Sequence, residues 1–364
     1  MKPFIPEMLP PENLNFKRLI RIAGEANAAL ARYDGLLQAV VNPEILLSPL
    51  TTNEAVLSSK IEGTQATMDE VLHHEAGIRI NEESKKLDIQ EIANYRSMLI
   101  HAEKEMAGRP LNLFLIRQMH KELMSGVRGS KSEPGKFRDR QNWIGRPGLP
   151  IEQATYIPPE PHQLQVCLND LEKYIKSDDG DVLVQSAIIH AQFEIIHPFL
   201  DGNGRIGRLL IPLFLFFKKR LKRPMFYLSE YLENNRSEYY LHLKNISSQG
   251  DWNSWIEFYL KAIKQQGKRN GERIEHTLDL YKTTTKRIRE IARTQYNIEI
   301  TDALFHKPMF SSSDIQTRTK IAKQTLTPIL KLLTEAGILT IIKKAKGRSP
   351  AVMKFEKLLS ITEK

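Results

Sequence analysis

The sequence of 364 residues predicts a mainly α-helical protein that carries a small β-hairpin and a C-terminal winged helix. Three observations lead to this prediction. Apolar residues recur at helical spacing over most of the chain, Gly and Pro concentrate at 126–161, and the segment after residue 310 places two helices before two short β-type runs. That last order is typical of a winged helix. With 41% hydrophobic and 26% charged residues, the composition excludes a wholly disordered chain.

The first two thirds of the chain predict a series of helices. After a Pro-rich start, residues 14–39 carry apolar side chains at helical spacing. A second helix is expected to open at Thr51, which has capping-box spacing to Glu54, and to stop at Gly63. Further helices are predicted over 88–106, 112–124, 161–176, 182–196, from a Gly-rich turn at 201–204 to residue 220, and onward to about residue 295.

The β-type runs occur in two places. Residues 141–145 and 154–158 flank a turn-rich middle, which predicts a small hairpin standing on the helical body. In the tail, a Ser-capped helix is predicted over 311–320, a helix over 322–336 closed by Gly337, and two strands around a turn at 345–349.

Length and texture predict three regions: an N-terminal helical region at 1–88, a helical core at 89–263, and a linker helix with the winged helix at 264–364.

The single cysteine, Cys167, cannot form an internal disulfide, which fits a reducing compartment. The longest strongly apolar stretch, 209–217, has nine residues, whereas a membrane span needs about twenty. We therefore expect a soluble, cytoplasmic protein without a membrane partner.

The net charge of +10 is placed unevenly along the chain. Residues 261–364 contain 22 basic and 10 acidic residues, while the first 260 residues contain 31 basic and 33 acidic residues. This asymmetry suggests a polyanion near the C-terminal region. A solvated basic surface without a partner is an equally good explanation.

The segment from His197 to Arg208 concentrates a histidine, an acid, three glycines, an amide and two arginines in twelve residues. Glycines ahead of a helix let backbone N–H groups converge on an anion, and the helix N-terminus adds positive potential. Arg205 and Arg208 share one helix face and can bind phosphate oxygens. Asp201 can hold Mg²⁺, and His197 can remove a proton from a hydroxyl. Together these groups suit attack on a nucleotide phosphate.

The same segment contains Gly202-x-Gly204-x-x-Gly207, which matches the dinucleotide-binding fingerprint. That fingerprint needs a preceding strand within a βαβ unit, whereas residues 183–196 favour a helix. We therefore disfavour a dinucleotide site.

The pattern H-P-F-x-D-G-N-G-R-x-x-R at 197–208 is the signature of Fic proteins, with every defined position filled. The chain resembles this family over about residues 90–260, and the N-terminal helices extend the resemblance. It implies a Fic-type helical bundle with a β-hairpin flap at 134–158 that docks a target segment as an added strand. It also implies transfer of AMP from ATP to a Ser, Thr or Tyr hydroxyl of a target protein. Gly204 argues against the variant that has Lys there and transfers phosphate.

The resemblance also implies roles for individual residues. His197 would be the base and Asp201 the Mg²⁺ ligand. Asn203 would contact the α-phosphate, and the two arginines the β- and γ-phosphates. The whole triphosphate cradle would consist of Gly202, Asn203, Gly204, Arg205, Ile206, Gly207 and Arg208. The family places its adenine pocket near Asn234, Tyr239 and Tyr240, although the two tyrosines are as well explained by core packing.

The segment Ser58-Ser59-Lys60-Ile61-Glu62-Gly63 resembles the family's inhibitory motif, at the position found in the class with an N-terminal inhibitory helix. The resemblance implies that Glu62 pairs with Arg208 and occupies space that the γ-phosphate needs. ATP would then bind with its α-phosphate badly placed for in-line attack. Ser58, one turn earlier, shares the face of Glu62. An ordinary exposed glutamate is the alternative.

In the tail, Lys320, Lys323 and Gln324 would lie at the exposed N-terminal end of the second helix, where recognition helices meet base edges. The wing would carry basic residues suited to phosphate contacts: Lys343, Lys344, Lys346 and Arg348. Because winged helices also dock proteins, DNA and protein partners both stay open.

The sequence therefore predicts an autoinhibited, Mg²⁺-dependent protein adenylyltransferase. Three alternatives stay open: a DNA-binding regulator that senses nucleotide, an enzyme with another donor (a different nucleotide or a choline-bearing diphosphate), and an enzyme that removes AMP with Glu62 aligning a water. The sequence does not identify the target protein, its modified hydroxyl or the oligomeric state, and a homodimer stays open.

Overall fold

The computed structural model describes residues 2–106, 109–127, 133–146, 148–347 and 349–363. Arg348, which we expected on the wing, lies outside the described residues, as do 128–132 and 147 near the predicted hairpin. The chain forms two compact units, each assembled from three stretches of sequence. The first comprises Met1–Asp34, Leu57–Thr64 and Gln90–Lys268, and the second comprises Gly35–Val56, Gln65–Ile89 and Arg269–Lys364. The predicted boundaries at 88 and 263 stay a prediction.

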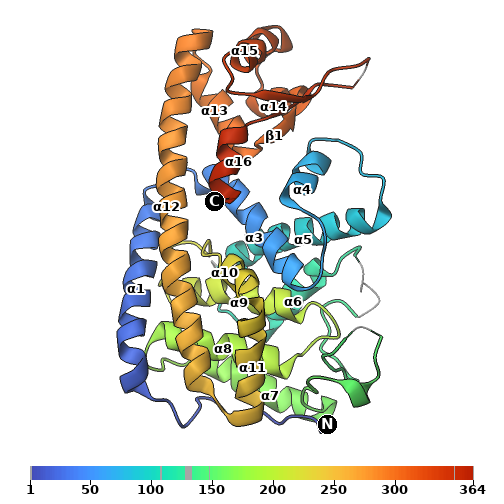
Figure 1. Cartoon of the computed structure of the whole chain (residues 1–364), viewed down its shortest axis with the longest axis vertical. Helices are drawn as coiled ribbons and strands as arrows, with labels where there is room; N and C mark the ends of the chain where they lie inside the picture. Colours follow the sequence, from blue (N-terminus) through green and yellow to red (C-terminus); the bar gives the residue numbers. More distant parts are fainter. Residues whose placement is uncertain (1, 107–108, 128–132, 147, 348, 364) are drawn as a thin grey trace. The chain divides into compact units, whose positions relative to one another are not determined.

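The first unit is built from helices, labelled in Figure 1. Those wholly within it are α6 (Leu113–Leu123), α7 (Pro161–Lys176), α8 (Val182–Ile196), α9 (Asn203–Phe217), α10 (Ser229–Asn234) and α11 (Arg236–Gln249). Four helices contribute residues to both units: α1 (Phe16–Gln38), α3 (Ser48–Ile61), α5 (Glu83–Met106) and α12 (Trp252–Ala292).

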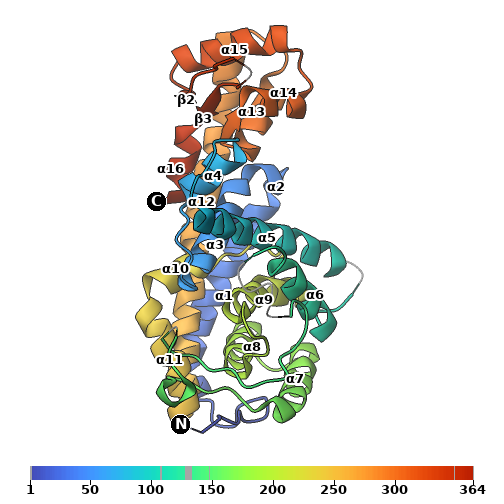
Figure 2. The same ribbon diagram turned by 90° about the vertical axis from the view of Figure 1, so that its right-hand side faces the viewer.

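Helices α8 and α9 form the core of the first unit. Every residue of α8 from Leu183 to Ile196 is buried except Glu194, and α9 is buried from Asn203 to Leu215. A helix that is apolar on all sides belongs in the interior of a protein. The two helices pack against each other, with α7 and α11 against α8 and α6 against α9 (Figure 2). The core therefore fixes both ends of the turn at 197–202.

Most helix boundaries in this unit agree with the sequence predictions, including those of α6, α7 and α8. The predicted start of α3 at Thr51 is wrong, because the helix begins at Ser48 and the Thr51 hydroxyl donates to the Leu47 carbonyl at 3.3 Å. The stop at Gly63 is confirmed by its left-handed φ of +97°. The predicted hairpin is reduced, in the described residues, to one antiparallel bridge between Ile144 and Tyr156.

The second unit combines short helices with a three-stranded sheet. Its own elements are α2 (Pro43–Leu46), α4 (Met68–Glu75), α13 (Asn297–His306), β1 (Met309–Ser311), α14 (Ser312–Thr319), α15 (Lys323–Glu335), β2 (Thr340–Lys343), β3 (Val352–Lys354) and α16 (Glu356–Glu363). The sheet is antiparallel in the order β1-β3-β2, and Met353 of β3 pairs with Phe310 on one side and Ile341 on the other.

The predicted elements of the tail are present, with additions. Ser311 caps α14 in a capping box with Asp314, and Gly337 follows α15 with a φ of +67°. Strands β2 and β3 form the predicted hairpin. The sequence analysis did not predict α13, β1 or α16. The assignment of this region as a winged helix stays a prediction.

Among the described residues, none of the helices combines the length and the apolar character that crossing a membrane requires.

Candidate active site

The turn that joins α8 to α9 has a left-handed residue at each end. His197 follows α8 with φ +48° and ψ +61°, and Gly202 precedes α9 with φ +78°. Directly after Gly202, Asn203 closes the turn with its side chain, which accepts from the Phe199 N–H and donates to the Phe199 carbonyl, both at 2.8 Å. Both polar atoms of Asn203 are thus used within the turn, and its predicted contact with the α-phosphate stays a prediction.

A buried histidine that the sequence analysis missed, His120 on α6, holds the same turn. Its ring stacks on Phe199 with centroids 3.7 Å apart. Its Nδ1 accepts from the Gly135 N–H at 2.9 Å, so its Nε2 carries the proton that is donated to the Asp201 carbonyl at 3.0 Å. Burial lowers the pKa of His120 to about 4, which keeps this tautomer neutral.

The imidazole of His197 is arranged as a proton acceptor. Its Nδ1 lies 3.3 Å from the Glu194 carbonyl, which can only accept, so Nδ1 carries the proton and Nε2 has a free lone pair. Burial lowers the pKa of His197 to about 4, although its bond to Glu194 and the charge of Glu62 oppose this shift. His197 is therefore neutral at pH 7, as a general base requires.

Asp201 presents its carboxylate at the open side of the turn. Its side chain is 46% exposed, and Oδ1 accepts from the Gly202 N–H at 2.6 Å and lies 3.4 Å from Arg205 Nη2. No cluster of three or more His, Cys, Asp or Glu suited to a metal occurs in the part of the chain that the structure describes. A single exposed carboxylate fits Mg²⁺, which commonly binds through one or two carboxylates plus phosphates and waters.

Both arginines of the motif are buried, and each is paired with a carboxylate. The Arg205 side chain is 4% exposed, and its Nη1 lies 2.7 Å from Glu91 on α5. The Arg208 side chain is 2% exposed, and its Nη2 lies 2.8 Å from Glu62 just after α3. A buried guanidinium needs such a partner because its desolvation is expensive. The sequence analysis did not identify Glu91, which is 114 residues from Arg205 and has no local signal.

The predicted inhibitory residues converge on Arg208. Its Nε donates to Ser58 Oγ at 2.9 Å and its Nη2 donates to the Ser58 carbonyl at 2.7 Å, beside the Glu62 ion pair. A Cβ on Gly204 would overlap Glu62 Oε1, so this carboxylate lies directly against the first turn of α9. Burial raises the pKa of Glu62, but Arg208 and Arg205 outweigh it and hold this pKa below its ordinary value.

A second carboxyl, Glu194, lies beside the motif. It is the one side chain of α8 after Val182 that is not fully buried, but its Oε1 is inaccessible and has no hydrogen-bond partner among the described residues. A Cβ on Gly207 would overlap this oxygen. Burial raises the pKa of Glu194 to about 8, so the group is mainly protonated at pH 7. The sequence analysis did not single out Glu194. An isolated acidic residue in an otherwise apolar helix is the signal that could have identified it.

The predicted adenine-pocket residues do not behave alike. Tyr239 is 1% exposed, and its hydroxyl bonds to His190 Nε2 at 3.0 Å, while His190 Nδ1 bonds to the Gly207 carbonyl. Tyr240 is 42% exposed, with its ring 5.2 Å from that of Tyr239. Asn234 is exposed at the end of α10. The structure therefore brings the rings of Tyr239 and Tyr240 together and leaves Asn234 exposed. Among the predicted nucleotide-binding residues, Tyr239 and Ile206 are buried in the core.

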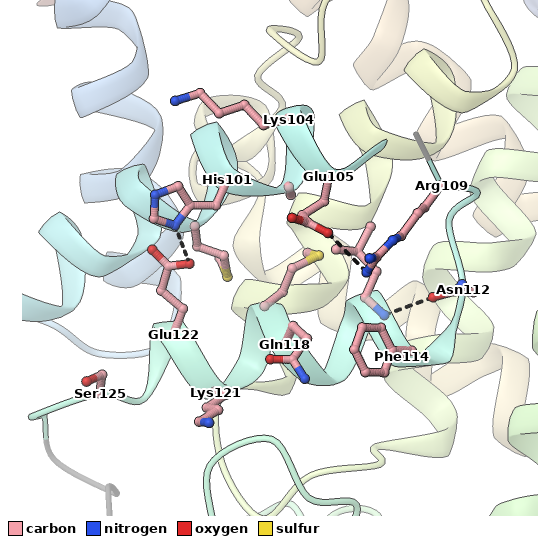
Figure 3. A pocket seen from close by; sticks show the side chains of 14 residues that line it. His101, Lys104, Glu105, Arg109, Asn112, Phe114, Gln118, Lys121, Glu122 and Ser125 are labelled. Carbon is pink, nitrogen blue, oxygen red and sulfur yellow. Dashed lines mark hydrogen bonds and ion pairs between the residues drawn. The ribbon is translucent and has the colours of Figure 1, made fainter. Parts of the chain in front are cut away.

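A cavity of about 610 Å³ lies between α5 and α6 (Figure 3). Polar pairs line it, including His101 with Glu122 at 2.9 Å and Arg109 with Glu105 at 3.3 Å. None of its lining residues belongs to the predicted site. We therefore assign the site from the geometry of the turn and not from this cavity.

Comparisons with known proteins agree with the motif. Residues 20–104 match the Fic/DOC family N-terminal region, and residues 110–215 match the Fic/DOC family. Proteins named protein adenylyltransferase Fic from Drosophila sechellia and Drosophila erecta are 28% and 29% identical over 169 residues. Those residues are 46% of this chain and 28% of each fly protein, so the match spans less than a third of these relatives.

Solved structures share the fold. A Fic family protein from Desulfovibrio desulfuricans superposes with a TM-score of 0.62 at 22% identity, covering 95% of this chain and 98% of that chain. A Fic domain containing signaling protein from Bacteroides thetaiotaomicron gives a TM-score of 0.56 at 17% identity, covering 70% of this chain and 97% of that chain.

The turn geometry predicts opposite effects of one substitution at two glycines. In Gly202→Ala, the left-handed backbone is strained and the new Cβ meets Met124 Sδ at 3.1 Å, so we expect the unfolding free energy to fall by about 1–2 kcal/mol. The control Gly24→Ala adds a methyl to open space on α1 and should raise it by about 0.5–1 kcal/mol. Urea unfolding measures both, and equal losses would contradict the prediction.

Proposed function

The chain belongs to the Fic/DOC family, as its motif predicted, and we propose that it is an autoinhibited protein adenylyltransferase. It would transfer AMP from ATP to a Ser, Thr or Tyr hydroxyl of a target protein. One observation carries the proposal: His197, whose Nδ1 bonds to a backbone carbonyl so that Nε2 can accept a proton, lies in the turn before two arginines that carboxylates from outside the motif hold. The fly relatives named protein adenylyltransferase support the same reaction.

In this reaction, the Nε2 of His197 accepts the proton of the target hydroxyl while the hydroxyl oxygen attacks the α-phosphorus of ATP. The bond from the α-phosphorus to the bridging oxygen breaks, and pyrophosphate leaves. The backbone N–H groups at the start of α9, with Arg208, would bind the leaving phosphates. Asp201 would hold Mg²⁺, which neutralises phosphate charge when bound. His197 later gives its proton to solvent or to the leaving group.

Inhibition would follow from competition for Arg208. The guanidinium is already engaged by Glu62 and Ser58, and the Glu62 carboxylate lies against Gly204, where a phosphate would approach α9. Because the pKa of Glu62 is held below its ordinary value, the carboxylate stays charged at neutral pH and would repel a triphosphate. ATP could then bind only in a pose that misplaces its α-phosphate.

Three other functions of this site make different predictions with labelled nucleotides. A nucleotide sensor retains ATP without transferring label. An enzyme with another donor labels protein only with that donor. An enzyme that removes AMP releases label from a modified protein, and needs Glu62 to do so.

We expect Glu62→Gly to raise the incorporation of AMP into protein by at least about tenfold, because Arg208 loses its competing carboxylate. Glu62→Gly combined with His197→Ala should show no incorporation, because no base remains. Mass spectrometry after incubation with ATP and Mg²⁺ reports the adduct and its site. As a control, Glu75→Gly removes a carboxylate from the end of α4 and should leave incorporation unchanged. Equal labelling of Glu62→Gly and the parent would disprove inhibition by Glu62.

The lowered pKa of His197 predicts an unusual pH profile. In the Glu62→Gly protein, kcat/KM for ATP should stay level from pH 7 to about 5 and decline only as His197 becomes protonated near pH 4. The lost Glu62 charge had raised this pKa, so its removal shifts the decline further toward acid. Circular dichroism at each pH would check that the protein stays folded. A decline centred near pH 6.5 would mean that His197 is solvated as an ordinary histidine.

The second unit supports a further proposal, contact with DNA. Lys320, Lys323 and Gln324 are exposed at the N-terminal end of α15. Lys343, Lys344 and Lys346 are exposed at and after the end of β2. In the described part of this unit, these five lysines have no ion-pair partner, so their charge is available to phosphates. Exposed Ile341 and Ile342 nearby would instead suit a protein partner.

The full-length protein should retard duplex DNA at low salt, and the affinity should fall linearly with the logarithm of salt concentration. Lys343→Glu with Lys344→Glu should weaken binding and reduce the salt slope by about 2, because two phosphate contacts are lost. Lys282→Glu, an exposed position on α12, is the control. The absence of any retardation at low salt would rule out DNA as the partner.

A further inference from the structure

Five consecutive backbone carbonyls, from Ile195 to Phe199, accept hydrogen bonds from the segment around the flap. The Tyr156 hydroxyl donates to Ile195, the Arg138 guanidinium to Ile196 and His197, the Arg138 N–H to Pro198, and the Asn142 amide to Phe199, at 2.8, 3.4, 2.9, 2.9 and 2.9 Å. The last carbonyls of an α-helix have no partner within the helix. Here the flap segment supplies partners to the last two carbonyls of α8, those of Ile195 and Ile196, and to the three carbonyls after the helix.

Arg138 makes the central contacts of this set. Its Nε donates to the His197 carbonyl at 2.9 Å, and its Nη2 donates to the Pro159 carbonyl at 2.6 Å. The residue is 4% exposed, and in the described residues it has no carboxylate within ion-pair distance. A buried guanidinium without a counter-charge is unfavourable for stability alone. Because Arg138 is buried among carbonyls instead of carboxylates, we infer that it holds the backbone around them in place.

The task concerns the conformation of His197. A non-glycine residue in the left-handed region costs on the order of 1 kcal/mol and persists only when its surroundings hold it there. His197 has φ +48°, and its N–H bonds to the Phe193 carbonyl at 3.0 Å. The bond from Arg138 Nε fixes the carbonyl on the other side of the residue. With both peptide groups held, the backbone that carries the imidazole is fixed, and the contact of Nδ1 with the Glu194 carbonyl at 3.3 Å sets the direction of the ring.

We propose that Arg138 is a positioning residue that orients the His197 imidazole toward the incoming hydroxyl and mechanically joins the flap to this base. The inference rests on the proposed transfer reaction. One planar guanidinium spans from Pro159, directly after the flap, to His197, so a displacement of the flap reaches the base through a single rigid group. A lysine, which carries one compact charged head, cannot bridge the two carbonyls in the same way.

The test uses the full-length Glu62→Gly protein as the parent and adds Arg138→Lys, which keeps the charge and removes the fork. Tyr156→Phe is a milder second variant, because it removes only the hydroxyl that bonds to Ile195. Arg223→Ala, which breaks a partly buried ion pair with Glu103 in the same unit, is the control for lost stability. For each protein we would measure kcat for AMP transfer, the Kd for ATP, the melting temperature, and deuterium exchange of the peptide at 193–200.

We expect Arg138→Lys to lower kcat about 100-fold, as misplacement of a reacting group does, while the Kd for ATP stays at the parental value. Tyr156→Phe should lower kcat about fivefold. Arg223→Ala should lower the melting temperature and leave kcat unchanged. Of the two arginine variants, only Arg138→Lys should raise deuterium exchange at 193–200, since the backbone there loses the contacts that anchor it and its N–H groups open more readily.

The inference is overturned if Arg138→Lys keeps the parental kcat, or if its Kd for ATP rises by the factor by which kcat falls. If Arg138→Lys does not fold, a parental kcat in Tyr156→Phe overturns it. If the Glu62→Gly parent transfers no AMP, the proposed reaction fails by itself. Deuterium exchange then tests the positioning role of Arg138 separately. Unchanged exchange at 193–200 in Arg138→Lys excludes this role, and increased exchange supports it.

Discussion

Two guanidinium groups buried at the start of α9 impose the main constraint on the first unit. A buried charge without a partner is costly, so Arg205 and Arg208 each require an anion. Glu91 and Glu62 supply it, and both come from outside the motif. A triphosphate carries the same kind of charge and would compete with Glu62 for Arg208. The proposed inhibition would thus follow directly from burying an arginine that also binds phosphate.

The groups around the turn divide into neutral and charged sets. Burial lowers the pKa of His120 and His197 to about 4 and raises that of Glu194 to about 8, so all three are mainly neutral at pH 7. The two histidines act through hydrogen bonds with fixed directions. Charge is confined to the arginines and their partner carboxylates. The separation leaves His197, the proposed base, with a proton affinity that is set by burial and an orientation that is set by backbone contacts.

The flap segment has a structural task besides any contact with a target. It supplies hydrogen bonds that the end of α8 and the turn after it lack, and Arg138 donates three of the five, two from its guanidinium and one from its backbone N–H. Any force on the flap therefore acts on the backbone of His197. Gly135 adds a second connection, because its N–H bonds to His120, which holds the carbonyl of Asp201. His197 and Asp201, the proposed base and metal ligand, are thus both held by contacts that begin in the flap segment.

The sequence by itself determined the helical class, the turn between α8 and α9, and the groups on that turn, because helical periodicity, glycines and the motif are local signals. It misplaced a capping box at Thr51, while the structure forms one at Thr67, since local spacing is the same at both and only packing distinguishes them. Only the tertiary structure decided that Glu91 pairs with Arg205 and that Arg138 holds His197, at separations of 114 and 59 residues. Buried charges choose partners by proximity in space, and that proximity exists only once the helices have packed.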